Sequence, residues 1–555
     1  MGESLARIEP YGNWESPISA ASVARSGGRP DWPGWVGEEI WWTEPRPAEG
    51  GRVTLMRLRD GTGARAGTAE EVLAAPWNIR NLVIEYGGRP WAALPLPGDQ
   101  GGPVLVFTNF SDQRLYRYRP DVPGSEPEPL SPVPEYRSGM RFAEFFIHPS
   151  RLEAWGVRET FTGPAPTDVR RDIVAVPLDG SAAADPARIR VLAASHHFLT
   201  CPRLSPGGSH LSWIGWNHPA MPWDETELCV AETGSGEPGG ALGEPHVRTG
   251  ANGEPEGMPG KEAHVLAGGR GESAGQPVSE SIVQAEWLDE RTLVYVSDPG
   301  GWWNLYRLRL DDPRPVPLCP LQEEFGGAMW RLGYSWFVPI TGGRIAAVHG
   351  RDSTQLSILD PGGTESRRDG PSGSAGTLRA VGDTYTEWAS CLAASGSRIA
   401  AVAASPGRPY ELVRVDAGSG EVAVLRTLPH DPVDPGYLPR PQARTFRGED
   451  GRDIHASVYQ PRNPRFSGPR GEPPPFAVFV HGGPTGRSPM VYDLQIAYSP
   501  AGGSGLSRST TADRPATAAH TGSGCGRTGA WWTWRTARRW PARWPRREPP
   551  TATGW

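Results

Sequence analysis

Short strands of alternating apolar and polar residues recur between residues 30 and 428, each followed by turn residues and a second strand. Such pairs occur at 39–43 with 53–57, 104–108 with 114–118, 210–214 with 227–231, 292–296 with 304–308, and 398–402 with 411–415. A period of two is typical of strands, so these pairs predict antiparallel hairpins. Their blade-length spacing favours a β-propeller over the alternative, a run of separate β-sandwiches.

The pattern is interrupted at residues 233–275, where Gly, Glu, Pro and Ala dominate and large apolar residues are few. This composition predicts a flexible insertion between strands. Residues 271–275 (GESAG) match the G-x-S-x-G nucleophile elbow of hydrolases. An elbow needs a strand before the serine and a helix after it, whereas Pro277 follows here, so we interpret the match as accidental.

A different pattern begins at residue 429. Residues 444–447 and 454–460 predict a hairpin, and a Pro- and Arg-rich loop leads from it to an apolar strand at 476–480. Two antiparallel strands followed by a buried parallel strand are typical of the start of an α/β-hydrolase sheet. The sequence then reads His-Gly-Gly-Pro, and the backbone N–H groups of Gly482 and Gly483 are candidate donors to an oxyanion. The alternative is an ordinary strand-to-loop turn.

Composition narrows the class of protein. The chain has 555 residues, with Gly 71, Pro 60, Trp 23 and a net charge of -6. The tryptophans argue against a disordered low-complexity chain, and the charge gives no general attraction to nucleic acid or to an anionic membrane. Five cysteines without metal-ligand spacing predict free thiols in a reducing compartment. The N-terminus lacks the apolar core of a signal peptide and no run is long enough to span a bilayer, so we expect a cytoplasmic protein.

Short motifs up to residue 498 resemble the prolyl oligopeptidase family, most closely its acylaminoacyl-peptidase and dipeptidyl-aminopeptidase-like members. They are residues 10–17 (PYGNWESP), 76–79 (PWNI), 85–88 (EYGG), 108–116 (TNFSDQRLY), 216–224 (WNHPAMPWD), 297–306 (SDPGGWWNLY), 323–327 (EEFGG) and 481–484 (HGGP). The resemblance implies a seven-bladed propeller that admits only peptide-sized substrates to a C-terminal α/β-hydrolase. It also implies a Ser nucleophile activated by His and oriented by Asp, with no cofactor. By the same resemblance, Gly482 and Gly483 match the oxyanion loop.

The family pattern stops after Tyr498. No G-x-S-x-G follows His481, and the only later histidine and aspartates are His520, Asp493 and Asp513, none of which has a hydrolase context. Without a Ser–His–Asp triad we expect this chain to be catalytically inactive. The family reaction would be hydrolysis of short peptides through an acyl-enzyme, with release of an acyl-aminoacyl group or a dipeptide. The alternative is a propeller that binds peptides without cutting them.

The tail at residues 499–555 has an unusual composition. It contains no Val, Ile, Phe, Tyr, Met or Lys, and Leu506 is its only aliphatic residue beyond Ala. Such a segment predicts disorder. Its Arg, Ala, Pro and Trp are typical of GC-rich DNA read out of frame: residues 531–535 (WWTWR), started one base earlier, can give Val-Val-Asp-Val-Glu, close to a family string. We therefore expect a frameshift near codon 498. Nucleic-acid or membrane binding by the Arg and Trp residues is the alternative.

Two further side-chain groups are candidate sites. Acidic pairs in related peptidases hold a free substrate amine, which makes Glu323 and Glu324 candidates, with a solvated surface pair as the alternative. His196 and His197 have no third ligand near them in sequence, so we predict no metal site. The expected organisation is an N-terminal segment at 1–29, a propeller at 30–428, the start of a hydrolase at 429–498 and the tail at 499–555. The sequence leaves the oligomeric state open.

Overall fold

The computed structural model describes residues 6–26, 28–59, 67–95, 102–165, 167–233, 263–273, 276–362, 376–448, 451, 453–480 and 485–509. The chain divides into two compact units, Gly28–Pro429 and a second unit in which Met1–Gly27 joins His430–Trp555. Among the described residues, no helix is long and apolar enough to cross a membrane.

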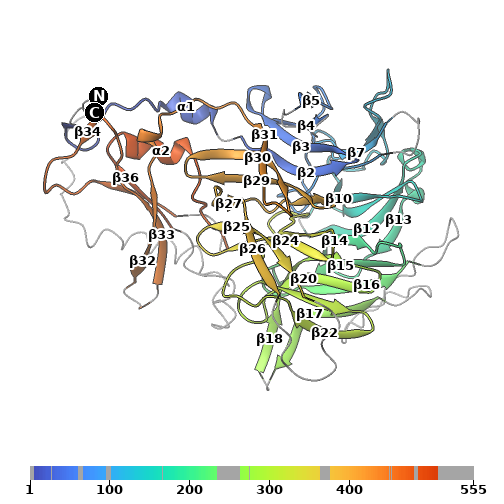
Figure 1. The fold of residues 1–555 in the computed structure, drawn as a ribbon. Helices are drawn as coiled ribbons and strands as arrows, with labels where there is room; N and C mark the ends of the chain where they lie inside the picture. Colours follow the sequence, from blue (N-terminus) through green and yellow to red (C-terminus); the bar gives the residue numbers. More distant parts are fainter. Residues whose placement is uncertain are drawn as a thin grey trace. The chain divides into compact units, whose positions relative to one another are not determined.

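The described strands of Gly28–Pro429 form seven antiparallel sheets, which are the blades of a seven-bladed β-propeller (Figure 1). The blades, in chain order, are β2 (Asp31–Val36), β3 (Glu39–Arg46), β4 (Arg52–Leu58) and β5 (Ala69–Glu71); β6 (Trp91–Leu94), β7 (Val104–Thr108), β8 (Leu115–Tyr118) and β9 (Glu128–Pro129); β10 (Met140–His148), β11 (Glu153–Phe161), β12 (Val169–Pro177) and β13 (Arg190–Ala193); β14 (Phe198–Leu204), β15 (His210–Trp216), β16 (Glu227–Glu232), β17 (His264–Ser273) and β18 (Gln276–Glu280); β19 (Ile282–Trp287), β20 (Thr292–Ser297), β21 (Asn304–Arg309) and β22 (Asp312–Pro317); β23 (Phe337–Ile340), β24 (Arg344–Gly350), β25 (Thr354–Asp360) and β26 (Thr377–Val381); and β27 (Glu387–Trp388), β28 (Ala393–Ser395), β29 (Arg398–Ser405), β30 (Arg408–Asp416) and β31 (Val422–Thr427). Short 3-10 helices η1 (Pro47–Glu49), η2 (Ser181–Ala183) and η3 (Pro186–Arg188) lie between strands.

The five hairpins expected from the hydrophobic pattern are confirmed, with each predicted pair of strands hydrogen-bonded in an antiparallel register. Middle strands such as β20 and β29 are buried on both faces because each blade packs between two neighbours. The aromatic pair Trp41 and Trp42 is fully buried in this packing.

The first and last blades close the ring through side chains. Glu44 on β3 is fully buried and binds Arg426 on β31, with Nε–Oε1 and Nη2–Oε2 distances of 2.7 and 3.2 Å. Apolar residues of both blades join one core cluster around Trp42. Among the described strands, none is shared between these two blades, so side chains close the ring.

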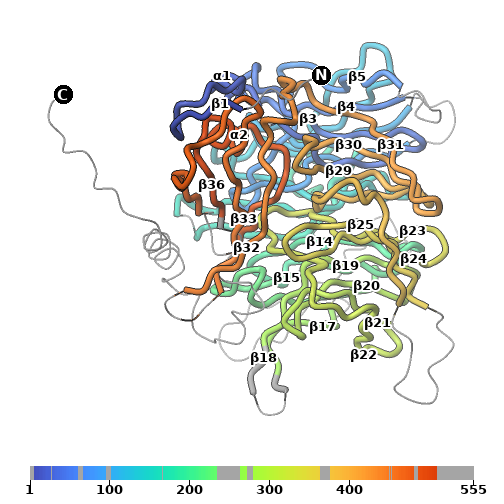
Figure 2. Tube along the Cα trace, turned by 60° about the vertical axis from the view of Figure 1, so that its left-hand side comes forward, coloured from blue at the N-terminus to red at the C-terminus, as the bar shows by residue number. Residues whose placement is uncertain are grey.

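The insertion expected at 233–275 is shorter than the sequence suggested. Its last part forms β17, which pairs with β16 as the fourth strand of its blade and continues as a hairpin with β18. Figures 1 and 2 show this hairpin projecting from the ring. Residues 234–262 lie outside the described residues. Ser273 ends one strand of an antiparallel hairpin, so the G-x-S-x-G match has no helix after it and is not a nucleophile elbow.

The second unit contains an incomplete α/β-hydrolase sheet in the order β32 (Pro441–Arg447), β33 (Asp453–Tyr459), β36 (Gly505–Ser509), β35 (Phe476–Phe479). β32 and β33 form the expected hairpin, and β36 runs antiparallel to β33 and parallel to β35. The remaining elements are β1 (Arg7–Ile8), α1 (Ala20–Arg25), η4 (Pro435–Tyr437), β34 (Phe466–Ser467) and α2 (Leu494–Ala501). β1 pairs in parallel with β34, and Ile18 packs against α2.

The start of the tail differs from the expectation of disorder. Residues 499–509 form the end of α2 and the strand β36. The reason lies in Leu506, which is 2% exposed and packs with Tyr459 and Ile496. Because β36 also lies between two partner strands, its backbone groups are paired even though its side chains are mostly small or polar. Residues 510–555 lie outside the described residues.

The strand β35 is less buried than its apolar sequence suggested. Its residues alternate between half-buried and exposed, and Phe479 is 44% exposed. In a complete hydrolase sheet, helices and further strands cover such residues on both faces. Among the described residues, β35 pairs only with β36 and is therefore a sheet edge, which is a template for association with other chains.

We expect Phe479→Lys to reduce concentration-dependent self-association, because a charge on an exposed edge strand opposes edge-to-edge pairing. Light scattering over a concentration series measures this self-association. The control is Val133→Lys, which replaces a 75%-exposed apolar residue away from any sheet. Equal effects of the two substitutions would contradict a role for the edge.

Candidate functional site

The predicted oxyanion donors follow β35 in the sequence. Gly482 and Gly483 belong to residues 481–484, which lie outside the described residues. The strand that leads to them is described: β35 ends at Phe479 and pairs in parallel with β36. The loop thus begins at the carboxyl end of a parallel strand, which is where α/β sheets carry their ligand sites.

The acidic pair lies between β22 and β23, and each carboxylate has a partner inside the propeller. Glu324 accepts a hydrogen bond from the backbone N–H of Trp303 at 3.0 Å. Glu323 lies 2.6 Å from Nδ1 of His349, a buried residue whose Nε2 accepts from the Gln355 amide at 3.2 Å. His349 therefore carries its proton on Nδ1 and donates it to Glu323. The side chain of Glu323 is 34% exposed, so this carboxylate reaches solvent while it contacts His349.

A third carboxyl group extends this acidic region. Asp298 follows β20 and accepts the backbone N–H of Ser281 at 2.7 Å. Burial raises its pKa to about 7, and the neighbouring charges of Glu280 and Glu324 act in the same direction, against the Ser281 hydrogen bond. The region thus holds an aspartate that is half protonated near neutral pH beside the carboxyl groups of Glu280 and Glu324.

Asp298→Asn should stabilise the protein by about 2 kcal/mol above pH 7. The folded-state pKa is raised, so between about pH 4 and pH 7 the folded chain holds a proton that the unfolded chain has lost. Wild-type stability therefore falls as pH rises through this window, and asparagine removes that slope while its Oδ1 keeps the Ser281 bond. Urea unfolding at pH 5 to 8 measures the free energy of unfolding of both proteins and its slope with pH.

The control is Asp311→Asn, which changes an exposed carboxylate paired with Arg309. The pKa of Asp311 is lowered by that pair, so its loss cannot produce a stability that declines toward pH 7. Identical pH slopes in wild type and Asp298→Asn would contradict the raised pKa.

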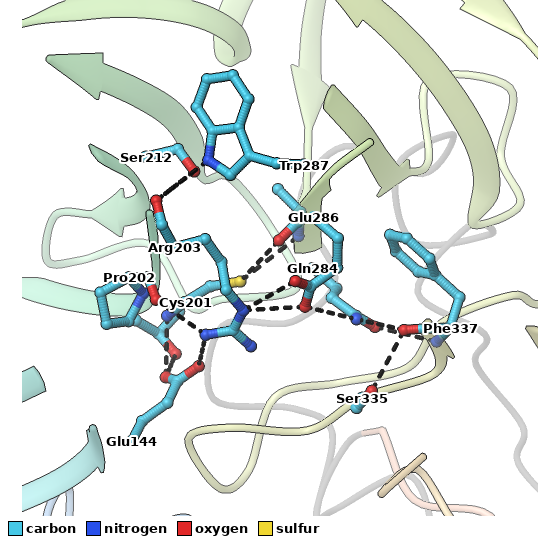
Figure 3. A network of polar contacts seen from close by, with 12 residues as sticks. Glu144, Cys201, Pro202, Arg203, Ser212, Gln284, Glu286, Trp287, Ser335 and Phe337 are labelled. Carbon is cyan, nitrogen blue, oxygen red and sulfur yellow. Dashed lines mark hydrogen bonds and ion pairs between the residues drawn. The ribbon is translucent and has the colours of Figure 1, made fainter. Parts of the chain in front are cut away.

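An ionic network around the buried Glu144 connects the inner strands of three blades (Figure 3), with the side chains of Arg203 and Glu286 23% and 18% exposed. Arg203 on β14 donates from Nη1 to Glu144 on β10 at 3.1 Å, and from Nε to Glu286 on β19 at 2.9 and 3.0 Å. Glu144 also accepts from the Thr200 hydroxyl at 2.6 Å and from the Cys201 backbone N–H at 2.9 Å. Every side-chain oxygen of Glu144 therefore has a donor, as a buried carboxylate requires.

Unusual backbone conformation places these side chains. Glu144 and Cys201 have φ values of 51° and 55°, in the left-handed region that non-glycine residues seldom adopt. Each lies at a bulge in the innermost strand of its blade. A bulge redirects a side chain, and here it brings residues of neighbouring blades together. Sequence analysis missed the network because its members are 59 and 83 residues apart and no local motif marks them.

The histidine pair has acidic and thiol neighbours that the sequence did not reveal. The Ser195 hydroxyl accepts from Trp213 Nε1 at 3.0 Å and lies 2.7 Å from His196 Nδ1, and His196 Nε2 lies 3.1 Å from the Glu227 carboxylate. The ligand atoms of His196, Glu227 and Cys229 lie within 4.8 Å of one another. Since both imidazole nitrogens already have partners and burial raises the pKa of the Cys229 thiol, the cluster is satisfied as a packed core group.

Comparison with known proteins gives a clear set of structural relatives. No protein-family model and no curated protein matches the chain. A puromycin hydrolase mutant complexed with PGG has a TM-score of 0.78 and 45% identity, and the match covers 91% of this chain and 69% of that chain. A puromycin-hydrolyzing peptidase of Mycobacterium tuberculosis has a TM-score of 0.77 and 37% identity over the same shares.

More distant structures share the fold. Prolyl oligopeptidase B from Galerina marginata, bound to a 25mer macrocyclization substrate, has a TM-score of 0.61 and 10% identity over 94% of this chain and 67% of that chain. At this identity the likeness shows the fold alone. The propeller, the hydrolase sheet and the 45% identity to puromycin hydrolase together show that the chain belongs to the prolyl oligopeptidase family of serine peptidases.

Proposed function

We propose that this chain descends from a serine peptidase that releases an acyl-aminoacyl group or a dipeptide from short peptides, and that the 555-residue chain itself does not cleave them. The 45% identity to a puromycin hydrolase supports the peptidase origin. The observation that carries the loss of activity is the sequence after His481, which contains no G-x-S-x-G and therefore no nucleophile on an elbow.

The reaction of the lineage would be acyl transfer. A serine hydroxyl attacks the peptide carbonyl and a histidine takes its proton. The C–N bond then breaks, the histidine returns the proton to the leaving amine, and water hydrolyses the remaining acyl-enzyme. The N–H groups of Gly482 and Gly483 would stabilise the negative oxygen of the tetrahedral intermediate. Removing the nucleophile and the base leaves only transition-state binding, so peptide hydrolysis falls by several orders of magnitude, roughly 10⁶-fold in comparable enzymes.

The test is labelling of the purified chain with a fluorophosphonate probe, read by intact mass. We expect no adduct, and stoichiometric labelling would overturn the proposal. The positive control is a gene in which one base restores the alternative frame after codon 498: its product should gain both the adduct and peptide hydrolysis. Sequencing of the gene separates a fixed frameshift from an error in the printed sequence.

A second candidate function is peptide binding without cleavage, favoured by the acidic region beside the half-exposed Glu323. We propose that Glu323 and Glu324 hold the free amine of a short peptide, with Glu323 making the contact and Glu324 fixing the Trp303 loop. A labelled tripeptide should bind more tightly with a free than with an acetylated N-terminus. Glu323→Gln should abolish this difference, and equal binding of both peptides would exclude the role. Asp311→Asn is the matched control, since it removes a remote exposed carboxylate.

A further inference from the structure

The connection from β22 to β23 takes an unusual course through the propeller. Residues 325–336, here called the axial segment, contain no helix and no named strand. A connection between neighbouring blades needs only to reach the next inner strand at the rim of the channel. This connection instead contacts all six of the other blades before it enters β23 in the sixth blade.

The contacts identify the blades one after another. Gly326 lies against Val283 and Val296 of the fifth blade, where an added Cβ would come within 2.8 Å of each side chain. The ring of Trp330 lies 4.8 Å from that of Trp223 in the fourth blade. Gly333, at φ +87°, faces Glu144 of the third blade, with 3.3 Å from an ideal Cβ to its Cγ.

The remaining contacts are made by neighbouring residues. Leu332 accepts from Arg89 N–H at 2.9 Å and forms a parallel bridge with Gly88, just before the second blade. Arg331 binds Asp31 of the first blade at 2.9 Å. Ser335 forms a parallel bridge with Cys391 of the seventh blade, and its N–H donates to Ser390 at 2.9 Å. The axis is the region that all seven blades surround, so a segment of twelve residues that contacts six blades and then enters the remaining one lies across the axis.

The segment is fixed by packing as well as by hydrogen bonds. Leu332 is 1% exposed. The guanidinium of Arg331 lies over the Trp32 ring at 4.5 Å, and the same ring stacks with Tyr334 at 6.1 Å. At the end of the segment, the backbone N–H of Trp336 donates to the side-chain carbonyl oxygen of Gln284 at 2.7 Å. This bond connects the segment to the network of Figure 3. An ion pair, two aromatic contacts and backbone pairing on two sides thus hold the segment in place.

We propose that the axial segment closes the channel of the propeller, so that peptides cannot pass along its axis. For the peptidase lineage this makes the segment a determinant of substrate access, because substrates must reach a catalytic centre by another path. That consequence rests on the proposed function. The closure itself does not, and it can be measured in the chain as it exists.

The chain carries its own reporter of closure. The backbone of Cys391 forms the parallel β-bridge with Ser335, and Cys391 is 5% exposed. Burial, together with the nearby Asp31 carboxylate, raises the pKa of its thiol to about 12. A neutral, covered thiol reacts slowly. Cys229 is equally buried but lies in a core cluster with Trp155 and Trp213, between the third and fourth blades. Comparison of the two thiols therefore separates opening at the axis from loosening of the whole propeller.

The experiment is alkylation of the folded chain at pH 8 with iodoacetamide and with a peptide-sized maleimide, quantified for each cysteine by mass spectrometry. In wild type we expect both thiols to be protected from both reagents. Arg331→Ala should raise the rate at Cys391 at least tenfold and leave Cys229 unchanged. Asp31→Asn, which keeps the shape of the side chain, should raise the Cys391 rate less. The control variant is Arg309→Ala, which breaks an exposed ion pair with Asp311 outside the axial segment.

Two outcomes would overturn the proposal. Rapid reaction of wild-type Cys391 with the peptide-sized reagent would show an open axis. Rates at Cys391 that stay unchanged, or that rise only together with Cys229, in both Arg331→Ala and Asp31→Asn would show that the segment does not act as a seal. Neither outcome touches the proposed peptidase origin, which the fluorophosphonate experiment tests.

Discussion

Arg203→Met is expected to lower the free energy of unfolding of the propeller by about 4 kcal/mol, the loss typical when a buried carboxylate is left without its cation. Methionine fills a similar volume but leaves Glu144, whose side chain is 4% exposed, without its cation. Glu286 loses both of its bonds to Nε. Because the network joins three blades, the loss appears in the global transition measured by urea unfolding followed by tryptophan fluorescence.

A nearby cation offsets part of this loss. Burial and the neighbouring charge of Arg203 lower the pKa of Arg89, which faces the same two carboxylates. When Arg203 is gone, that repulsion disappears and Arg89 is attracted to Glu144 and Glu286 without competition. A double-mutant cycle of wild type, Arg203→Met, Glu144→Gln and the double variant measures the coupling free energy between Arg203 and Glu144. We expect the double variant to be more stable than Arg203→Met alone, because the buried Glu144 side chain is then neutral and no longer a carboxylate without its cation.

The outcome that contradicts this view is strict additivity of the two substitutions, which would mean that Arg203 and Glu144 stabilise the blades independently. Arg309→Ala is the matched control, since it removes an arginine from an exposed pair with Asp311. It should leave the transition unchanged, as exposed ion pairs usually do.

The sequence predicts the propeller because local pattern and local structure agree there. Residues 292–296 and 304–308 alternate around turn residues, and they form the central hairpin of the fifth blade, β20 with β21. The same logic identifies β29 with β30 but ends the first strand early, since Ala403, Ala404 and Ser405 have no strong alternation and are held in β29 by their neighbours.

The features that the sequence did not reveal depend on contacts between distant residues. Arg203 meets its partners only after three blades have assembled, and the bulges at Glu144 and Cys201 leave no compositional trace. The axial segment shows the same limit, because 325–336 has the glycines and aromatics of an ordinary loop. Burial of Leu506 likewise comes from Tyr459 and Ile496, so the composition of the tail alone gave disorder where β36 forms.

Substitution at the ring closure is expected to have the second large effect on stability, because no described strand is shared between the first and last blades. Glu44→Gln is expected to lower the free energy of unfolding by about 3 kcal/mol. The fully buried carboxylate accepts from Trp42 Nε1 at 2.9 Å, Arg46 Nη1 at 2.7 Å and Arg426 Nε at 2.7 Å. Glutamine keeps the shape but turns an N–H group toward donors, so at least one donor is left without an acceptor.

The pH dependence of this loss has a defined sign. Burial opposes ionisation of Glu44, but the hydrogen bonds from Arg426, Arg46 and Trp42 outweigh it and lower its pKa below 4.5. A lowered folded-state pKa contributes stability that is present above the unfolded pKa and is lost as pH falls through the folded one. The gap between wild type and Glu44→Gln should therefore be full at pH 7 and shrink below about pH 4.

Glu38→Gln is the matched control for ring closure. Glu38 also pairs with an arginine across the first and last blades, Arg398 at 2.6 Å, but its side chain is 72% exposed. Its substitution should leave unfolding unchanged at pH 7, because water and salt screen an exposed pair. If the two variants lost the same stability, burial of Glu44 would not be what closes the ring, and the apolar cluster around Trp42 would have to hold the two blades together alone.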